Sequence, residues 1–238
     1  MAKVVAIHQP NFLPWLGWFD KLARADVFVL LDGVQFPRTG KGTWVNRVKL
    51  LVGGKPQWVT APIVRAAGST QLISEVRVDD AQPWREKTLR TIEHNYRRAP
   101  AFDEVFPLVE EGLRADTDGL SELNERAARA VARAVGLDES KFVRSSELET
   151  QGQSTELLIE LTRAAGGDVY LAGGGAGGYQ EDEKFAAAGV ELRCQAFEHP
   201  TYPQPGDDFV PGLSVIDALM NSGFAGTREL LAGSAVSS

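Results

Sequence analysis

The sequence has little of several residue types on which common protein chemistries depend. Its 238 residues include one cysteine, Cys194, so an internal disulfide, a zinc ribbon and CxxC redox chemistry are excluded. The GxSxG, HExxH and Walker A patterns are absent, and with them three familiar catalytic or phosphate-binding signatures. No run of twenty apolar residues occurs, and charges and prolines interrupt residues 1–31. We therefore expect a cytoplasmic protein with neither a signal peptide nor a membrane span.

Positive charge is also in deficit. The 25 basic and 32 acidic residues give a net charge of −7, so we expect no binding to nucleic acid or to anionic membranes. The hydrophobic fraction of 43% and the charged fraction of 24% are ordinary for a globular protein. A chain of this length buries roughly 70–75% of the surface that its unfolded form exposes, so its core needs no disulfide or structural metal.

What the sequence does contain is a βαβ pattern at its beginning. Residues 3–7 form a short apolar run, and the prolines that follow exclude a helix directly after it. From Leu16 onward apolar residues recur at helical spacing, and a second apolar run covers residues 27–31. Two such strands joined by a helix pair in parallel. The polar residues expected on the outer face of the helix are Asp20, Lys21 and Arg24.

The remaining elements extend this pattern to a single α/β domain over residues 1–238. We predict a mostly parallel sheet of βαβ units, Rossmann-like or nucleotidyltransferase-like, with a helical insertion over about 83–136 and a flexible tail over about 232–238. A hairpin turns at Gly53-Gly54, Gly136 ends a helix and Ser214 caps the last one. The expected strands cover 44–50, 57–63, 141–144, 168–172 and 190–197, and the expected helices cover 83–99, 102–114, 120–135, 154–165, a short segment ending near 188, and 214–221.

Polar residues follow several predicted strands, where parallel α/β sheets bind their ligands. His8, Asp32 and His199 each come at or just after such a strand end. A histidine there can act as a general base or stabilise a developing charge; alternatively it caps a helix or bonds to a backbone carbonyl. Asp32 is a candidate base, metal ligand or sugar-hydroxyl acceptor, or else a turn-forming residue. Their spacing does not support a metal site, and we predict none. His94, inside a predicted helix, is expected to be a structural or surface residue.

A glycine-rich segment follows the strand predicted over 168–172. Gly173, Gly175 and Gly178 match the GxGxxG spacing, and Glu198 lies where a ribose acceptor would stand. Nearly every position of the segment is glycine or alanine, so such a match arises easily. We favour binding of a phosphate or carboxylate by backbone N–H groups over binding of a nicotinamide cofactor. The alternative is a flexible surface loop.

Two further observations concern binding and reactivity. Arg47 follows Asn46 in an aromatic strand and could pair with a phosphate, or it could lie on a solvated hairpin. Cys194 lies inside an apolar predicted strand with no base nearby in sequence, so we predict an inert thiol. The aromatic residues that could line a pocket, or pack in the core, are Trp15, Trp18, Phe36 and Trp44.

The chain resembles the WbqC-like protein family in segments that span nearly its whole length. The most specific segment is Ile7-His8-Gln9-Pro10-Asn11-Phe12-Leu13-Pro14-Trp15-Leu16-Gly17, and the others are residues 28–36, 44–47 and 213–219 and the motif His199-Pro200-x-Tyr202-x-Gln204. Members tend to carry a lysine or aspartate before the tyrosine that is here Tyr179, whereas this chain has Gly177-Gly178, a departure that bears on substrate or affinity. The family is associated with surface-polysaccharide and natural-product gene sets. The resemblance therefore implies a biosynthetic role, and amide-forming acyl or aminoacyl transfer to an amine is a plausible activity.

Three functional hypotheses follow. The first is an enzyme that transfers an acyl or aminoacyl group to the amine of an amino sugar or a natural-product intermediate, with His8 or His199 as the base. The second is ATP-dependent adenylyl or nucleotidyl transfer, in which His8 stabilises the transferred group. The third is a non-catalytic scaffold that positions a partner biosynthetic enzyme or a carrier protein. The expected ligand is a small molecule, and the sequence identifies no cofactor. The residues expected at the substrate, beside the catalytic candidates His8, Asp32 and His199, are Gln9, Asn11, Gln35, Asn46, Arg47, Gly174, Gly175, Tyr179, Tyr202 and Gln204.

Overall fold

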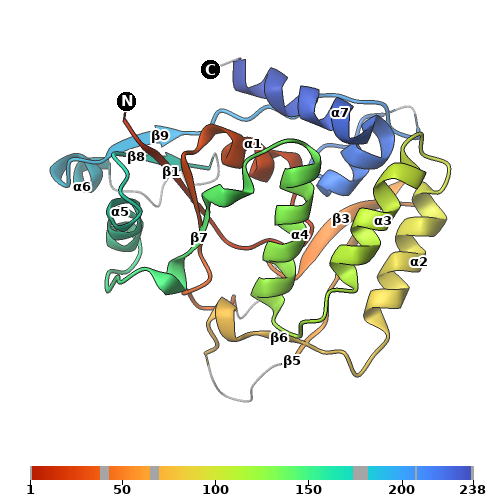
Figure 1. Ribbon diagram of the computed structural model, residues 1–238, viewed down its shortest axis with the longest axis horizontal. Coiled ribbons are helices and arrows are strands. Elements are labelled where there is room, and N and C mark those ends of the chain that lie inside the picture. Colours follow the sequence, from red (N-terminus) through yellow and green to blue (C-terminus); the bar gives the residue numbers. More distant parts are fainter. Residues whose placement is uncertain (1, 38–42, 65–69, 174–181, 207, 237–238) are drawn as a thin grey trace.

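A five-stranded sheet in which neighbouring strands are all parallel forms the centre of the fold. The computed structural model describes residues 2–37, 43–64, 70–173, 182–206 and 208–236 (Figure 1). The strand order is β7-β2-β1-β8-β9, which confirms the predicted α/β class with a mostly parallel sheet. The five strands are β1 (Val4–His8), β2 (Val27–Leu30), β7 (Phe142–Arg144), β8 (Val169–Ala172) and β9 (Glu191–Cys194).

The direction in which strands are added reverses at β1. The chain places β2 and then β7 on one side of β1, and it later returns to place β8 and β9 on the other side. This is the strand order of nucleotide-binding α/β folds, whose ligands bind beyond the carboxyl ends of the strands where the order reverses. In this protein that place is between β1 and β8. We call it the switch point and define it by Ile7 and His8 of β1 and Ala172 and Gly173 at the end of β8.

Helices cover both faces of the sheet. Val5 of β1 points to one face, where it packs in a cluster with Ile159 of α5 (Thr155–Ala164) and Phe185 of α6 (Asp182–Ala187). Ala6 points to the other face and belongs to a cluster with Trp18 of α1 (Leu16–Arg24). Because both faces are buried, β1 is a continuous apolar run rather than an alternating one.

A second group of elements lies between β2 and β7 in the sequence and to the right of the sheet in Figure 1. It begins with an antiparallel ribbon whose turn residues Gly53 and Gly54 have φ angles of 59° and 74°, so the predicted glycine turn is confirmed. The elements of this group are β3 (Arg47–Val52), β4 (Lys55–Thr60), β5 (Ile63–Val64), β6 (Arg77–Val78), α2 (Trp84–Tyr96), α3 (Phe102–Leu113) and α4 (Leu120–Ala134), with short 3-10 turns at Ile73–Glu75 and Glu139–Lys141; a third such turn, Ser145–Glu147, follows β7.

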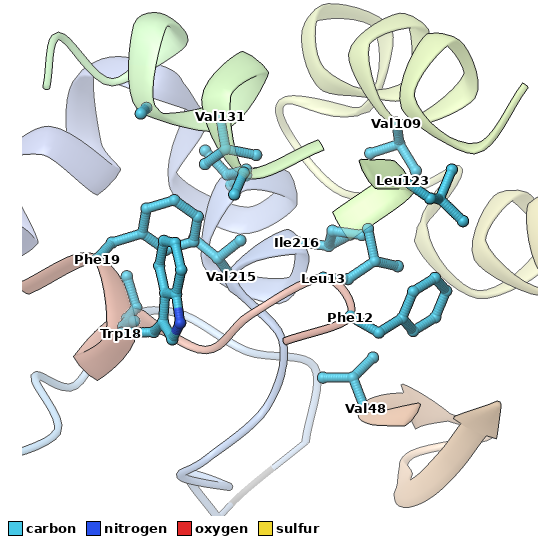
Figure 2. Close-up of a cluster of buried hydrophobic side chains, with 14 of the residues drawn as sticks. Phe12, Leu13, Trp18, Phe19, Val48, Val109, Leu123, Val131, Val215 and Ile216 are labelled. Carbon is cyan, nitrogen blue, oxygen red and sulfur yellow. The ribbon is translucent and has the colours of Figure 1, made fainter. Parts of the chain in front are cut away.

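The largest hydrophobic core joins this second group to the α1 face of the sheet. The last helix, α7 (Val215–Val236), packs against both α1 and α3. Figure 2 shows side chains from several parts of the chain converging there: Phe12 and Leu13, Trp18 and Phe19 of α1, Val48 of β3, Val109 of α3, Leu123 and Val131 of α4, and Val215 and Ile216 of α7. Phe12 and Leu13 are buried in this core, and they therefore fix the segment between β1 and α1 in place. Across the described ranges, no helix has both the length and the apolar character needed to cross a membrane.

Several local expectations differ from the structure. Asp20 and Lys21 were expected on the outer face of α1, but their exposed fractions are 0% and 2%. Asp20 is covered because Gln195, far away in the sequence, lies against α1 and donates to its carboxylate. Lys21 instead points toward the sheet, where it bonds the Ile7 carbonyl. Cys194 is exposed and ends β9, since that strand is shorter than its apolar pattern predicted. The hairpin strand ends at Thr60, and the separate strand β5 pairs with β6. The last helix continues beyond residue 221 through a kink at Gly223 (φ 69°) to Val236.

Candidate functional site

Two of the predicted catalytic residues lie at the carboxyl ends of neighbouring strands. His8 is the last residue of β1 and pairs with Leu30 of β2, and Asp32 comes two residues after Leu30. Gly173 follows directly on β8, on the other side of β1. The parallel sheet therefore brings His8, Asp32 and Gly173 to one edge, with His8 in the middle at the switch point.

The imidazole of His8 is kept neutral by its surroundings. Its pKa is lowered from 6.5 to about 3: burial is the largest cause, the charge of Lys21 acts in the same direction, and a hydrogen bond with the Gln9 carbonyl acts in the opposite direction. His8 Nδ1 lies 3.1 Å from the Gln9 carbonyl oxygen. A carbonyl can only accept, so Nδ1 carries the proton and Nε2 holds the free lone pair. At neutral pH His8 thus presents a proton acceptor at the switch point.

Lys21 is a member of this site that the sequence analysis missed. It projects from α1, and its Nζ donates a 2.8 Å hydrogen bond to the Ile7 carbonyl oxygen of β1. The Nζ also lies 5.9 Å from the centre of the Tyr170 ring, on β8. Burial lowers the pKa of this ammonium from 10.5 to about 7. Its position three residues after Trp18, on a helix whose buried face includes Trp18 and Leu22, was the signal that could have revealed it.

Asp32 is held by hydrogen bonds from the segment that follows β7. Its carboxylate accepts from Ser145 Oγ at 3.0 Å and from both the backbone N–H and Oγ of Ser146, each at 2.9 Å. These bonds satisfy much of a carboxylate that is 2% exposed and tie the end of β2 to the end of β7. Asp32 also lines a small polar cavity of about 300 Å³ with Arg144 and Ser146.

His199 lies on the outer side of α1 rather than on a strand end. Its ring lies 5.2 Å from the Trp15 ring at an interplanar angle of 36° and meets Phe197 edge-to-face at 5.1 Å. Burial lowers its pKa as well, although the side chain is only half-buried. Gly17 makes this cluster possible, since a Cβ there would lie 2.2 Å from Trp15 and 2.9 Å from Phe197.

Two predicted substrate residues, Tyr202 and Gln204, belong to a buried network around Asp217 of α7. Gln204 Nε2 donates to Asp217 Oδ1 at 2.8 Å and to the Tyr202 hydroxyl at 3.2 Å. Tyr96 of α2 donates to the other carboxylate oxygen at 2.9 Å and accepts from the Leu51 N–H at 3.0 Å. Burial raises the pKa of the Asp217 carboxyl, while the bonds from Tyr96, Tyr202 and Gln204 lower it. This network links α2, α7 and β3.

The other predicted substrate residues are spread over different parts of the structure. Asn46 donates to the Ala61 carbonyl at 3.0 Å, and the Arg47 guanidinium lies 4.4 Å from the Trp58 ring, which lines a groove of about 550 Å³ between β4 and α2. In Figure 1 this ribbon lies on the far side of the molecule from β8. Gln9, which is partly buried, follows His8 at the switch point, whereas Asn11 is buried and Gln35 is exposed. Gly174, Gly175 and Tyr179 lie outside the described residues.

The described residues contain no group of three or more His, Cys, Asp or Glu side chains that could hold a metal ion. His8, Asp32 and His199 therefore do not converge on a metal site in the part of the chain that can be described.

Comparison with known proteins identifies the family. The sequence profile of the WbqC-like protein family matches residues 9–229, nearly the full length of the chain. The chain belongs to the WbqC-like protein family. The match begins one residue after His8 and includes Lys21, Asp32, Gly173 and His199. Apart from His8, the residues at the carboxyl ends of the strands therefore lie within the matched region.

A curated protein is similar to the chain over nearly the same length. The uncharacterized protein Rv1507c of Mycobacterium tuberculosis is 30% identical over 223 residues, which are 93% of this chain and 94% of that protein. No solved structure matches the chain. The family is therefore shown by sequence along nearly the whole chain.

Proposed function

We propose that this chain is a small-molecule biosynthetic enzyme that forms an amide by transferring an acyl or aminoacyl group to an amine. The amine would belong to an amino sugar, as in polysaccharide assembly, or to a natural-product intermediate. The observation that carries the proposal is the neutral His8 imidazole, whose free Nε2 lies at the switch point of the sheet. Amide formation needs such a proton acceptor because the attacking nitrogen must lose a proton.

The proposed step uses an activated acyl donor, such as a thioester or an acyl phosphate. The amine nitrogen attacks the carbonyl carbon and forms the new C–N bond. The bond from that carbon to the leaving group breaks, and the leaving group departs with the electron pair. The nitrogen's proton passes to Nε2 of His8 and then to the leaving group or to water. Asp32 does not contact the reacting atoms in this scheme, since Ser145 and Ser146 bind its carboxylate; it positions the neighbouring strand ends.

The test is the substitution His8→Ala, assayed by mass spectrometry for the amide product with acyl-coenzyme A and an amino-sugar nucleotide. A positioned general base contributes about 10²–10⁴-fold, so we expect turnover to fall at least tenfold while thermal unfolding shows a folded protein. His94→Ala is the matched control, because His94 is exposed on α2. Unchanged turnover in His8→Ala would remove His8 from the mechanism.

The strand order favours ATP-dependent adenylyl or nucleotidyl transfer as a second candidate. The reversal between β1 and β8 is the arrangement at which α/β folds bind nucleotides. This function predicts ATP-dependent release of pyrophosphate without an acyl donor. Thermal-shift measurements with ATP–magnesium and with acyl-coenzyme A separate the two, since a ligand at a hundred times its Kd adds about 2.7 kcal/mol of stability. If neither ligand shifts unfolding and a biosynthetic enzyme or carrier protein co-purifies, the scaffold hypothesis replaces both.

A further inference from the structure

Lys21 places a positive charge inside the protein without a described carboxylate to balance it. Its side chain is 2% exposed, and within the described ranges its one hydrogen bond goes to the Ile7 carbonyl oxygen. The neighbouring Asp20 is already paired with Arg24 at 2.9 Å and accepts a bond from Gln195. A buried ammonium without a counterion is costly, which is why the pKa of Lys21 falls to about 7.

The ammonium group lies in the gap between the two strands of the switch point. The described β1–β8 pairing ends at Ala6 and Leu171. The His8 carbonyl accepts from Leu31 on the β2 side, and successive carbonyls of a strand point to opposite sides, so the Ile7 carbonyl points toward β8. Lys21 Nζ occupies the place beyond the last β1–β8 pair, where the Ile7 carbonyl would otherwise find a partner on β8.

Gly173 leaves space beside this ammonium. A Cβ added at Gly173 would lie 3.9 Å from Lys21 Nζ, and no other described atom outside its neighbours would come within 4 Å. The titratable groups that face Nζ from the described elements packed around it are His8 of β1 and Tyr170 of β8. On α7, Asp217 faces Tyr96 and Gln204 instead. Among the described atoms there is therefore room for a small group between Gly173 and the ammonium.

We propose that Lys21 is the anion anchor of the switch point and that it pairs with an oxyanion group of the substrate, a phosphate or a carboxylate. The anion supplies the counterion that the described protein lacks, and it binds next to Gly173. Identification of that anion as part of the acyl donor rests on the proposed function, whereas binding of an anion by Lys21 does not. The sequence suggested Arg47 as a residue that pairs with a phosphate. Its guanidinium lies over the Trp58 ring, and its strand, β3, lies away from β8 in Figure 1.

An anion on Lys21 would also act on His8. The charge of Lys21 is one of the causes that lower the pKa of His8, after burial. An anion next to Lys21 offsets that charge and so raises the pKa of His8 toward the neutral range. In the amide-forming scheme, the donor would strengthen the base when it binds.

The experiment measures binding of sulfate, as a phosphate substitute, and of acetate, as a carboxylate, by calorimetry at constant ionic strength. Neither probe titrates between pH 6.5 and 8.5. Only the protonated ammonium binds an anion, so we expect affinity to fall about tenfold for each pH unit above the pKa of Lys21. Binding of one probe but not the other identifies the anion class.

Four variants decide the outcome. Lys21→Met should lose at least tenfold in affinity, and Lys21→Arg, which stays charged, should bind without the pH dependence. Gly173→Ala fits the described structure but fills the space beside Nζ, so it should bind at least tenfold more weakly with unchanged thermal unfolding. Lys55→Met, at an exposed lysine of β4, should behave as the wild type.

The proposal is overturned if neither probe binds the wild type. It is also overturned if Lys21→Met leaves the affinity and its pH dependence unchanged, or if Lys21→Arg and Gly173→Ala both fold and do so. Failure of acyl transfer with sulfate or acetate binding intact would overturn the proposed function alone.

Discussion

Two basic side chains at the switch point, His8 and Lys21, resist protonation in the folded protein. Burial is the largest cause for both, and it lowers their pKa values to about 3 and about 7. A group whose pKa is lower in the folded than in the unfolded state contributes stability above its unfolded pKa and loses that contribution as pH falls. For Lys21 the window runs from 10.5 down to about 7, and for His8 from 6.5 down to about 3.

The pH dependence of stability therefore tests His8 directly. Between pH 6.5 and pH 4.5 the unfolded chain binds a proton at His8 that the folded chain does not, so wild-type stability should fall relative to His8→Gln by at most about 1.4 kcal/mol per pH unit. Urea unfolding of both proteins at pH 4.5, 5.5, 6.5 and 7.5 measures the difference. Parallel curves for the two proteins would show that the surroundings of His8 do not disfavour its charge.

The positions of individual residues were predicted where they depend on short stretches of sequence. The strand-end position of His8 followed from the apolar run before it and the prolines after it. Lys21 was missed because its burial depends on partners that periodicity does not reveal, namely Ile7 of β1 and Tyr170 of β8.

At the scale of elements, the sequence predicted most helices and strands because each carries its own signal. Gly136 ends α4 with a φ of 75°, as its position predicted, and the Ser214 hydroxyl accepts from the Ile216 N–H at the start of α7 at 3.2 Å. The short strands β5 and β6 were not predicted, since two residues each give no periodic pattern. They form because the chain between them folds back and brings residues 77–78 beside residues 63–64.

Tyr96 shows how strongly the helical elements depend on each other. Its hydroxyl donates to Asp217 of α7 and accepts from the Leu51 N–H of β3. Tyr96→Phe removes both bonds and leaves buried polar groups without a partner, at about 1–3 kcal/mol for each. We expect a loss of about 2–4 kcal/mol in the free energy of unfolding, measured by urea denaturation. Tyr202→Phe is the control: Tyr202 is only partly buried, whereas Tyr96 is buried, so this substitution should cost less than half as much.

At the scale of the whole molecule, the sequence predicted the class of the sheet but not which strands lie next to each other. The pairing of β1 with both β2 and β8 joins segments that are about 20 and 165 residues apart. Single polar side chains then hold distant segments around the site, as Asn124 of α4 does by donating to the carbonyls of Pro10 and Val45 at 2.8 and 2.7 Å. Such long-range contacts produce no periodic pattern in the sequence. The sequence therefore did not indicate that Tyr202 and Gln204 bond with Asp217 rather than lie at the switch point.

The exposed Cys194 at the end of β9 provides an experimental handle. It is the single cysteine of the chain, so a thiol-reactive fluorophore would label one known position without any prior mutagenesis. Cys194 pairs across the sheet with Ala172, the residue before Gly173. A dye attached there would report from one strand away on a ligand entering between β1 and β8, and its emission should change with sulfate or acetate in the wild type but not in Lys21→Met.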